Sequence, residues 1–325
     1  MTGKSVWQDR SVDLVGIDDI RTAAANLVGV AVRTPLLPAG WAGGDLWLKP
    51  ENLQPVGAFK IRGAYHAVVS LPDEGRAAGV VTHSSGNHGQ AVAYAARALG
   101  IPCVVVIPDV APEVKVAAVR ALGAEVVLVP PAERFTRAME LASSRGLSVI
   151  PPFDHPDVIA GQGTIGLEIV SELPDLAAVL VPVGGGGLAS GIATAVKALR
   201  PGVVVIGVEP ELAADARESL ESGVRVEWPV EQTYRTIADG MRTHLSDLTF
   251  AHLRERLDGI VTVSEDEIRS ALARLLWSAR LVVEPSGAAA VAAYLSARAG
   301  LPDGRTVAVI SGGNVDPALL AEIIC

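Results

Sequence analysis

Short apolar runs bounded by turn residues recur along the chain, and segments with helical spacing lie between them. This alternation is typical of βαβ units, whose strands are buried on both faces of a parallel sheet. The apolar runs predict strands over residues 80–83, 104–107, 125–129, 178–183, 203–208, 260–263 and 307–310. The helical spacing predicts helices over residues 17–30, 89–99, 112–122, 134–144 and 188–199. Ser264 and Glu267 have the spacing of a capping box, which predicts a further helix after them.

Three of the strand and helix units fall between about residues 71 and 152, which is enough chain for a compact lobe. We therefore expect an α/β protein of two domains, each an open, mostly parallel, twisted sheet flanked by helices. Residues 1–70 and 153–325 are expected to form a large domain, and residues 71–152 a small, mobile one.

Composition narrows the classes of function. The 325 residues carry a formal net charge of −9, which disfavours binding to nucleic acid because phosphates need a basic surface. Residues 176–196 are uncharged and long enough to span a membrane, but Pro182 and the glycines at 184–187 divide the run into a predicted strand, loop and helix. Cys103 and Cys325 are the only cysteines, so neither a disulfide framework nor a cysteine metal site is predicted. Charged residues precede any long apolar stretch, and we expect a cytoplasmic protein.

Lys60 is the first candidate for chemistry. It lies in an apolar segment that contains glycine, directly between Phe59 and Ile61. Burial lowers the pKa of an ammonium group, and the neutral amine can attack a carbonyl. That attack is how a Schiff base with pyridoxal phosphate begins. From this segment alone, a surface lysine on an amphipathic helix is the alternative.

Residues 184–187 are four consecutive glycines between a predicted buried strand and a predicted helix. Their backbone N–H groups can surround a phosphate at the positive end of that helix. The same run fits the dinucleotide fingerprint G-x-G-x-x-A through Gly184, Gly186 and Ala189, and Glu209 ends the next strand. A nicotinamide-dependent oxidoreductase is therefore a competing hypothesis. A purely structural turn is a third.

Two further loops carry polar groups at strand ends. Residues 82–90 read Thr-His-Ser-Ser-Gly-Asn-His-Gly-Gln, and such hydroxyl, amide and N–H groups at a helix start suit a carboxylate or a phenolate oxygen. An N-cap explains one of these serines but not the whole cluster. Residues 309–314 read Val-Ile-Ser-Gly-Gly-Asn, where Ser311 can make one hydrogen bond with a ligand. A plain turn is the alternative for this last segment.

The order of these segments is informative. The chain resembles the fold-type II pyridoxal phosphate enzymes of the tryptophan synthase β superfamily, in the branch of serine/threonine dehydratases and serine racemases. The segments that carry the resemblance are the Lys60 segment and residues 84–88, 162–164, 184–187, 236–240, 283–285 and 311–314. It covers nearly the whole chain. It implies pyridoxal phosphate as cofactor, a small amino acid as substrate, and a homodimer.

The resemblance also implies individual roles. Lys60 would hold the cofactor as an internal aldimine and then act as the base on one face of the substrate α-carbon. The other implied cofactor contacts are Gly184, Gly185, Gly186 and Gly187 at the phosphate, Asn87 at the ring hydroxyl, Phe59 against the ring, Gly240 at the ring edge and Ser311 at the pyridine nitrogen. Ser84, Asn87 and His88 would bind the substrate carboxylate. A neutral Ser311 cannot keep the ring nitrogen fully protonated, which favours elimination over transamination.

Ser85 bears on the outcome of the reaction. Serine racemases carry a serine at the matching position, on the face of the cofactor opposite the lysine, where it can exchange a proton with the α-carbon. Dedicated threonine dehydratases often have alanine there. Serine and hydroxyaspartate dehydratases resemble this pattern too, so Ser85 does not decide between elimination and racemisation.

Glu209, Ala213 and Asp215 match the divalent-cation site of the racemase-like branch, and two carboxylates with one backbone carbonyl suit Mg²⁺. A solvated helix start is the alternative. The chain departs from many relatives at Ala58, where they have serine, and it ends soon after Asn314, so that no isoleucine-sensing regulatory domain is expected.

We predict a pyridoxal phosphate-dependent ammonia-lyase that converts a small β-hydroxy amino acid, such as L-threonine or L-serine, to a 2-oxo acid and ammonia. The alternatives are an amino-acid racemase or a threo-3-hydroxyaspartate dehydratase that uses Lys60 and Ser85 on opposite faces. A nicotinamide-dependent oxidoreductase is the remote alternative.

Overall fold

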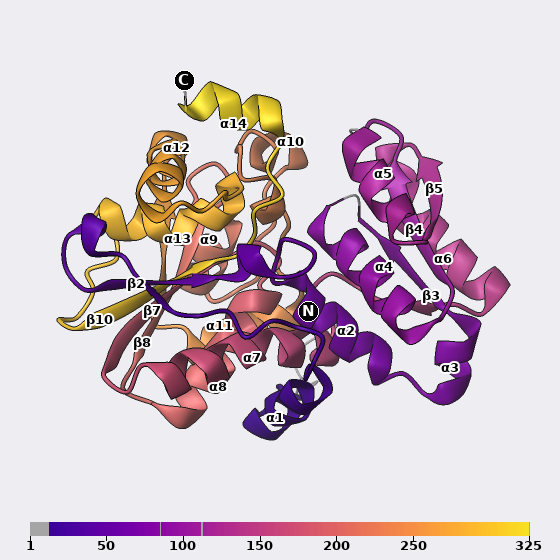
Figure 1. The fold of residues 1–325 in the computed structure, drawn as a ribbon, viewed down its shortest axis with the longest axis horizontal. Coiled ribbons are helices and arrows are strands. Elements are labelled where there is room, and N and C mark those ends of the chain that lie inside the picture. Colours follow the sequence, from indigo (N-terminus) through magenta and orange to yellow (C-terminus); the bar gives the residue numbers. More distant parts are fainter. Residues whose placement is uncertain (1–12, 85, 112, 325) are drawn as a thin grey trace, which may run out of the picture.

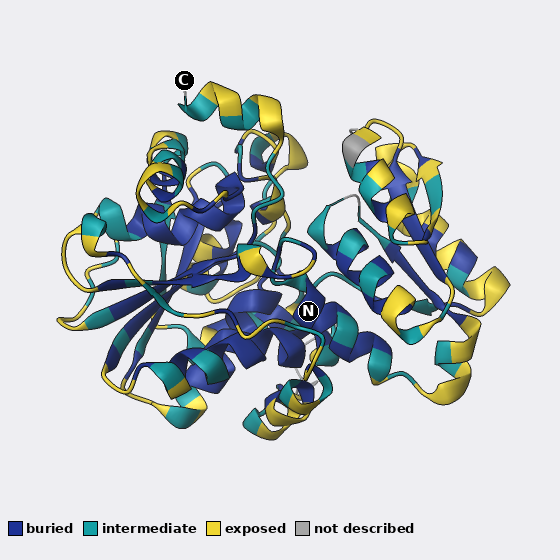
Figure 2. Ribbon diagram, viewed as in Figure 1, coloured by how far each residue is buried: buried dark blue, intermediate teal, exposed yellow. Residues whose placement is uncertain are grey.

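The computed structural model describes residues 13–84, 86–111 and 113–324. Their strands form two separate sheets, and helices pack on both faces of each (Figure 1). The buried residues follow the sheets and the inner faces of the helices, while the exposed ones lie on the outer helix faces (Figure 2). The predicted α/β class with mostly parallel sheets is confirmed.

The larger sheet has six strands in the order β1-β2-β10-β7-β8-β9. Their bounds are β1 (Leu37–Pro38), β2 (Leu46–Pro50), β10 (Arg305–Ile310), β7 (Leu176–Pro182), β8 (Val204–Pro210) and β9 (Gly259–Val263). Neighbouring strands are parallel apart from β1 and β2, which pair antiparallel. Because helices cover both faces, the central strand β7 is apolar throughout.

The smaller sheet has four parallel strands in the order β5-β4-β3-β6. Their bounds are β5 (Glu125–Val129), β4 (Cys103–Pro108), β3 (Val80–His83) and β6 (Ser148–Val149). The helices α3 (Asp73–Ala78), α4 (Asn87–Leu99), α5 (Glu113–Ala121) and α6 (Arg134–Arg145) surround this sheet (Figure 1). Their arrangement is consistent with the expected small domain, whose boundaries near residues 70 and 152 stay a prediction.

The remaining helices flank the larger sheet. On one face lie α12 (Glu265–Arg274) and α13 (Pro285–Leu295), and on the other α1 (Ile17–Asn26), α7 (Pro156–Glu172), α8 (Gly187–Leu199) and α11 (Asp247–Arg256) (Figure 1). Shorter helices are α9 (Asp215–Ser222), α10 (Val230–Thr233) and α14 (Pro317–Ile324). Helix α2 (Lys60–Val69) lies between the sheets and shares a hydrophobic core with α4 and β4.

The seven predicted strands all form, with ends within two residues of those expected. The capping box at Ser264 and Glu267 begins α12, as predicted. The first predicted helix was too long, since α1 ends at Asn26 and Gly29 has a left-handed φ of 78°. The residue expected to begin the 112–122 helix lies outside the described residues, and α5 is observed over Glu113–Ala121.

Helix α7 was not predicted from the sequence, because it is buried on nearly all sides and therefore has no polar face. It crosses both α2 and α8 with direct backbone contact. A Cβ atom at Gly161 of α7 would lie 2.5 Å from the Cα of Gly63 in α2, and one at Gly191 of α8 would lie 2.5 Å from the backbone nitrogen of Gly163 in α7. These three helices therefore pack as closely as backbones allow.

Among the described helices, none is long and apolar enough to cross a membrane. The uncharged run at residues 176–196 divides into β7, a glycine loop and α8, as the sequence predicted.

We expect Gly161→Ala to lower the free energy of unfolding by about 1–3 kcal/mol, because the added methyl group would overlap the backbone of α2. The matched control is Gly202→Ala, where an added Cβ meets nothing within 4 Å. It should change stability by less than about 1 kcal/mol. Urea unfolding followed by circular dichroism measures both variants. Equal stability of the two would contradict the close packing of α2 and α7.

Candidate active site

Lys60 begins helix α2, and its side chain lies against the loop that precedes α7. The Nζ atom donates a hydrogen bond to the carbonyl oxygen of Pro152 at 2.6 Å. Burial lowers the pKa of Lys60 to about 8, although the negative charge of Glu284 opposes this shift. A large fraction of the amine is therefore neutral near pH 8, which is the form that attacks a carbonyl.

The chain before Lys60 runs beside the end of strand β10. The N–H of Phe59 donates to the carbonyl of Ser311 at 3.0 Å, and the N–H of Gly313 donates to the carbonyl of Gly57 at 2.8 Å. The Phe59 ring centroid lies 5.0 Å from the Lys60 Nζ. This pairing brings Ser311, which is buried, next to the lysine from a position 251 residues away in sequence, that is, 311 minus 60.

The glycine loop, residues 184–187, connects β7 to α8 at the helix N-terminus. A Cβ at Gly185 would lie 2.4 Å from the Phe153 ring, and one at Gly184 would lie 2.9 Å from the carbonyl oxygen of Gly240. Side chains are thus excluded from the loop. The N–H groups of Gly184, Gly185 and Gly186 donate to no other described residue, so they are available to an anion at the positive end of α8.

Lys60 and the glycine loop meet on one short segment. Pro152 accepts the hydrogen bond from Lys60, and its neighbour Phe153 packs over Gly185 and Gly187. The structure therefore brings an amine and a phosphate-sized anion site together, as the sequence predicted for a phosphorylated aldehyde. Gly240 joins this group through its contact with Gly184.

Asn87 begins α4 and crosses from the smaller sheet to the larger one. Its Nδ2 donates to Glu284 Oε1 at 2.8 Å, and its Oδ1 accepts from Asn314 Nδ2 at 2.8 Å. Burial and the charge of Asp239 raise the pKa of Glu284 to about 7, while the hydrogen bond from Asn87 opposes the rise. Sequence reasoning quoted Glu284 and Asn314 only as parts of motifs and gave neither a role in the site.

His88 lies near Lys60 with its Nε2 at 2.9 Å from the carbonyl oxygen of Ile150. Burial and the nearby positive charge of Lys60 lower the pKa of His88 to about 3, so the ring is neutral at physiological pH. Because a carbonyl only accepts, Nε2 carries the proton, and the buried Nδ1 is an acceptor with no partner among the described residues. The His88 side chain therefore offers no donor to a substrate carboxylate in this arrangement.

The Ser84 hydroxyl accepts a hydrogen bond from the N–H of Gly86 at 3.3 Å. Ser85 lies outside the described residues. The N–H groups in the first turn of α4, rather than the imidazole of His88, are the donors that this loop can present to a carboxylate.

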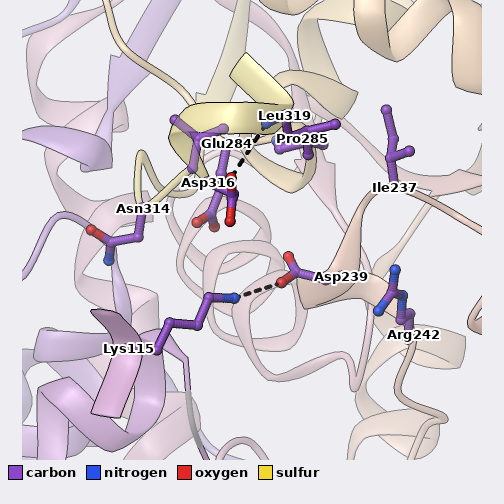
Figure 3. A pocket seen from close by; sticks show the side chains of 10 residues that line it. Lys115, Ile237, Asp239, Arg242, Glu284, Pro285, Asn314, Asp316 and Leu319 are labelled. Atoms are coloured by element: carbon purple, nitrogen blue, oxygen red, sulfur yellow. Dashed lines mark hydrogen bonds and ion pairs between the residues drawn. The ribbon is translucent and has the colours of Figure 1, made fainter. Parts of the chain in front are cut away.

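A cavity of about 250 Å³ adjoins Glu284 and Asn314. The side chains that line it include Lys115, Ile237, Asp239, Arg242, Asp316 and Leu319 (Figure 3). Lys115 of α5 reaches across to Asp239, at 3.1 Å between Nζ and Oδ2. The guanidinium of Arg242 donates to the carbonyl of Thr236 at 2.6 Å. The charge of Lys115 is thus paired with a carboxylate, whereas Arg242 bonds to a neutral carbonyl and keeps its charge.

The predicted cation ligands lie together at the end of β8 and the start of α9. Glu209 is buried, and its two oxygens accept from the N–H groups of Ala216 at 3.1 Å and Arg217 at 2.8 Å. Burial and the charge of Asp215 raise the pKa of Glu209 well above its ordinary value. Burial also raises the pKa of Asp215, against the opposing charge of His244. Two buried carboxylates that disfavour each other's ionisation fit a cation.

The part of the chain that the structure describes holds no group of three or more His, Cys, Asp or Glu side chains that could bind a metal ion. The set predicted here has two carboxylates and the Ala213 carbonyl, so this finding does not test it. The metal site stays a prediction.

An α/β enzyme with a half-buried, partly neutral lysine beside a side-chain-free loop at a helix N-terminus belongs to the class that binds a phosphorylated carbonyl cofactor through an amine. Residues 29–312 match the family described as pyridoxal-phosphate dependent enzyme. The chain belongs to this family, and the predicted resemblance, enzyme class and cofactor are confirmed.

Similarity to known proteins extends along almost the full chain. The L-threo-3-hydroxyaspartate ammonia-lyase of Saccharomyces cerevisiae is 42% identical over 316 residues, which cover 94% of this chain and 95% of that protein. The structure is similar to maize serine racemase, with a TM-score of 0.91, 36% identity, and coverage of 95% and 97% of the two chains. It is also similar to a threonine deaminase from T.th., with a TM-score of 0.88, 45% identity, and coverage of 93% and 99%.

The residues fit pyridoxal phosphate. The bare N–H groups of residues 184–186 suit its phosphate, Lys60 suits its aldehyde, and the buried hydroxyl of Ser311 lies next to the lysine segment. Membership of this family rules out the hypothesis of a nicotinamide-dependent oxidoreductase. Glu209, the candidate ribose ligand under that hypothesis, instead caps helix α9 with both oxygens.

We expect the amine of Lys60 in the cofactor-free protein to react with an acylating reagent with a pH midpoint of about 8. Exposed lysines should have midpoints near about 10.4. Glu284→Gln should move the Lys60 midpoint to lower pH, because the Glu284 charge favours the ammonium form. Competitive labelling with mass spectrometry measures both midpoints. The exposed Glu322→Gln is the control and should leave the Lys60 midpoint unchanged. A Lys60 midpoint equal to that of exposed lysines would contradict the burial argument.

Proposed function

We propose that the enzyme eliminates water from a small β-hydroxy amino acid, such as L-threonine or L-serine, and releases a 2-oxo acid and ammonia. The observation that carries this proposal is the depressed pKa of Lys60 at a site where the glycine loop and Ser311 converge. When bound, pyridoxal phosphate supplies an electron sink for charge at the substrate α-carbon. Relatives named as an L-threo-3-hydroxyaspartate ammonia-lyase and a threonine deaminase support the reaction class.

The residues of the chain divide the work. Lys60 holds the cofactor and then removes the proton from the α-carbon, for which its lowered pKa suits it as a base near neutral pH. Gly184, Gly185, Gly186 and Gly187 bind the phosphate with their N–H groups. Ser311 would offer a neutral hydroxyl to the pyridine nitrogen of the cofactor, which would favour loss of the β-hydroxyl over transamination.

Four further contacts complete the proposed site. Phe59 would pack against the pyridine ring of the cofactor, and Gly240 would lie at the edge of that ring. Asn87 binds the ring hydroxyl, for which its Nδ2 has a second N–H beside the one given to Glu284. Ser84, Asn87 and His88 bind the substrate carboxylate, with His88 contributing its backbone N–H.

The charged groups around the cavity bear on substrates that carry a second carboxylate. Lys115 is paired with Asp239, whereas Arg242 bonds to the neutral carbonyl of Thr236 and keeps its positive charge. Threo-3-hydroxyaspartate therefore stays an alternative substrate for the same elimination.

Racemisation is the second candidate, and the similarity to maize serine racemase favours it. Ser85 would then exchange a proton with the α-carbon on the face opposite Lys60. We further propose, from the sequence resemblance, that the enzyme is a cytoplasmic homodimer and that residues 71–152 form a mobile small domain.

We expect Lys60→Ala to lose at least about 10³-fold in 2-oxo acid formation from L-threonine, since it lacks both the cofactor anchor and the base. A coupled assay for the 2-oxo acid measures this across L-threonine, L-serine and threo-3-hydroxyaspartate. Wild-type protein that lacks a visible absorbance band after incubation with cofactor would contradict the proposal, as would a Lys60→Ala variant of wild-type rate. Chiral analysis of recovered serine with Ser85→Ala tests the second candidate, which predicts loss of inversion with much of the elimination retained.

We also propose that Glu209, Asp215 and the carbonyl of Ala213 bind Mg²⁺. Mg²⁺ at about 100 times its Kd should stabilise the folded protein by about 2.7 kcal/mol, measured as a rise in Tm that a chelator reverses. Glu209→Gln should abolish this rise, because it removes a ligand charge. Glu211→Gln, two residues away on an exposed side chain, is the control and should retain it. An equal rise in the Glu209→Gln variant would contradict the site.

A further inference from the structure

A buried cluster of four charges lies directly behind Lys60. Its members are Lys49 in β2, Glu51 just after β2, Arg62 in α2 and Glu168 in α7. The side chains of Lys49, Glu51 and Arg62 are no more than 2% exposed, and that of Glu168 is 14% exposed. Two positive and two negative charges sum to zero, which is what permits such burial.

Arg62 is the centre of this cluster. Its guanidinium donates to both oxygens of Glu51, at 2.7 and 2.8 Å, and to both oxygens of Glu168, at 2.6 and 2.9 Å. We call these two bidentate pairs the Arg62 clamp. Arg62 also donates to the Thr164 hydroxyl at 3.1 Å and to the Val32 carbonyl at 3.2 Å. Two bidentate pairs on one guanidinium fix its position in its own plane, and a lysine ammonium, with three donors at one point, cannot reproduce them.

The charges of Arg62 and Glu51 keep each other ionised. Burial alone would raise the pKa of Glu51, but the charges of Arg62 and Lys49 hold it below its ordinary value. Burial alone would lower the pKa of Arg62, but Glu51 and Glu168 raise it. Arg62 and Glu51 are therefore ionised at physiological pH, and the loss of either leaves a buried charge without its partner.

The Arg62 clamp acts on the first turn of α2. Arg62 follows Lys60 by two residues, so both belong to that turn. Glu51 ties the turn to the end of β2, and Glu168 with Thr164 ties it to α7. One residue further along, the N–H of Gly63 donates to the Gln162 side chain of α7 at 3.2 Å. The position and direction of the Lys60 side chain are thus set by contacts on the opposite side of its own helix, α2.

We infer that Arg62 is a positioning residue for Lys60: its clamp on Glu51 and Glu168 holds the first turn of α2 so that the amine stays in line with the glycine loop. Helix α7 carries Glu168 and crosses α8 at Gly163 and Gly191, and α8 begins at that loop. Arg62 therefore fixes the position of the Lys60 amine relative to the glycine loop, and α7 is the one helix between them. This inference rests on the proposed role of Lys60 as cofactor anchor and base.

The test is Arg62→Lys in the cofactor-loaded enzyme. This substitution keeps the positive charge but loses both bidentate pairs, so the first turn of α2 can shift. We expect kcat to fall by about 10- to 100-fold with a smaller change in KM, because misplacement of a reacting group by about 1 Å has effects of this size. We also expect faster release of the cofactor during dialysis and a shifted pH midpoint of its visible band.

Lys197→Met is the matched control. Lys197 lies on α8 and pairs with Asp258 at 2.6 Å, with a side chain 21% exposed, and it makes no contact with the Arg62 cluster. It should lower Tm while the band, its pH midpoint and cofactor release stay as in the wild type. If Arg62→Lys does not fold, Glu168→Gln replaces it, because glutamine keeps the shape and removes one charge of the clamp. The same readouts apply to that variant.

The inference is overturned if the clamp variant loses stability like Lys197→Met but keeps the wild-type band midpoint, cofactor release and kcat. Failure of the proposed function would look different. In that case wild-type protein would form no visible band with pyridoxal phosphate, or Lys60→Ala would retain turnover, whatever the behaviour of the Arg62 variant.

Discussion

The contact of three helix backbones is the constraint on which the active site depends. Helix α7 touches α2 at Gly161 and α8 at Gly163, with no side chain between them. Close-packed backbones cannot slide without overlap, so the two outer helices keep a fixed relation to each other. One of them begins with Lys60 and the other with the glycine loop. An amine and an anion site from segments over a hundred residues apart are thereby held at one place.

Exclusion of water from this region sets the protonation states of its titratable side chains. Burial brings Lys60 to a pKa of about 8 and Glu284 to about 7, and it keeps His88 neutral with a pKa of about 3. Each group thus moves toward its uncharged form, as a low dielectric demands. Arg62 escapes this rule only because two carboxylates compensate it. The site therefore pairs charges that fix geometry with nearly neutral groups that can exchange protons.

The sequence predicted those features that depend on local pattern. Strands buried on both faces are continuous apolar runs, and the start of α12 has its own capping signal. Strand β2 was missed because it contains the buried Lys49, whose charge is paired with Glu168 from a distant helix. The bond between Asn87 and Glu284 spans 197 residues and has no local signature. His88 was expected to bind the substrate carboxylate, but which of its groups can do so depends on the partner of its ring, the Ile150 carbonyl.

The two walls of the site are held with different strength. Behind Lys60, the Arg62 clamp and the glycine contacts are buried, so any movement would separate charges in a poorly polarisable interior. Across the cavity, the smaller sheet's α5 reaches the larger half through Lys115 and Asp239, whose side chains are 27% and 47% exposed. Such an exposed pair contributes only about 0–1 kcal/mol. The contacts that fix Lys60 therefore lie in its own half of the site, and the Lys115–Asp239 pair adds little to the contact between the halves beside the bonds of Asn87 with Glu284 and Asn314.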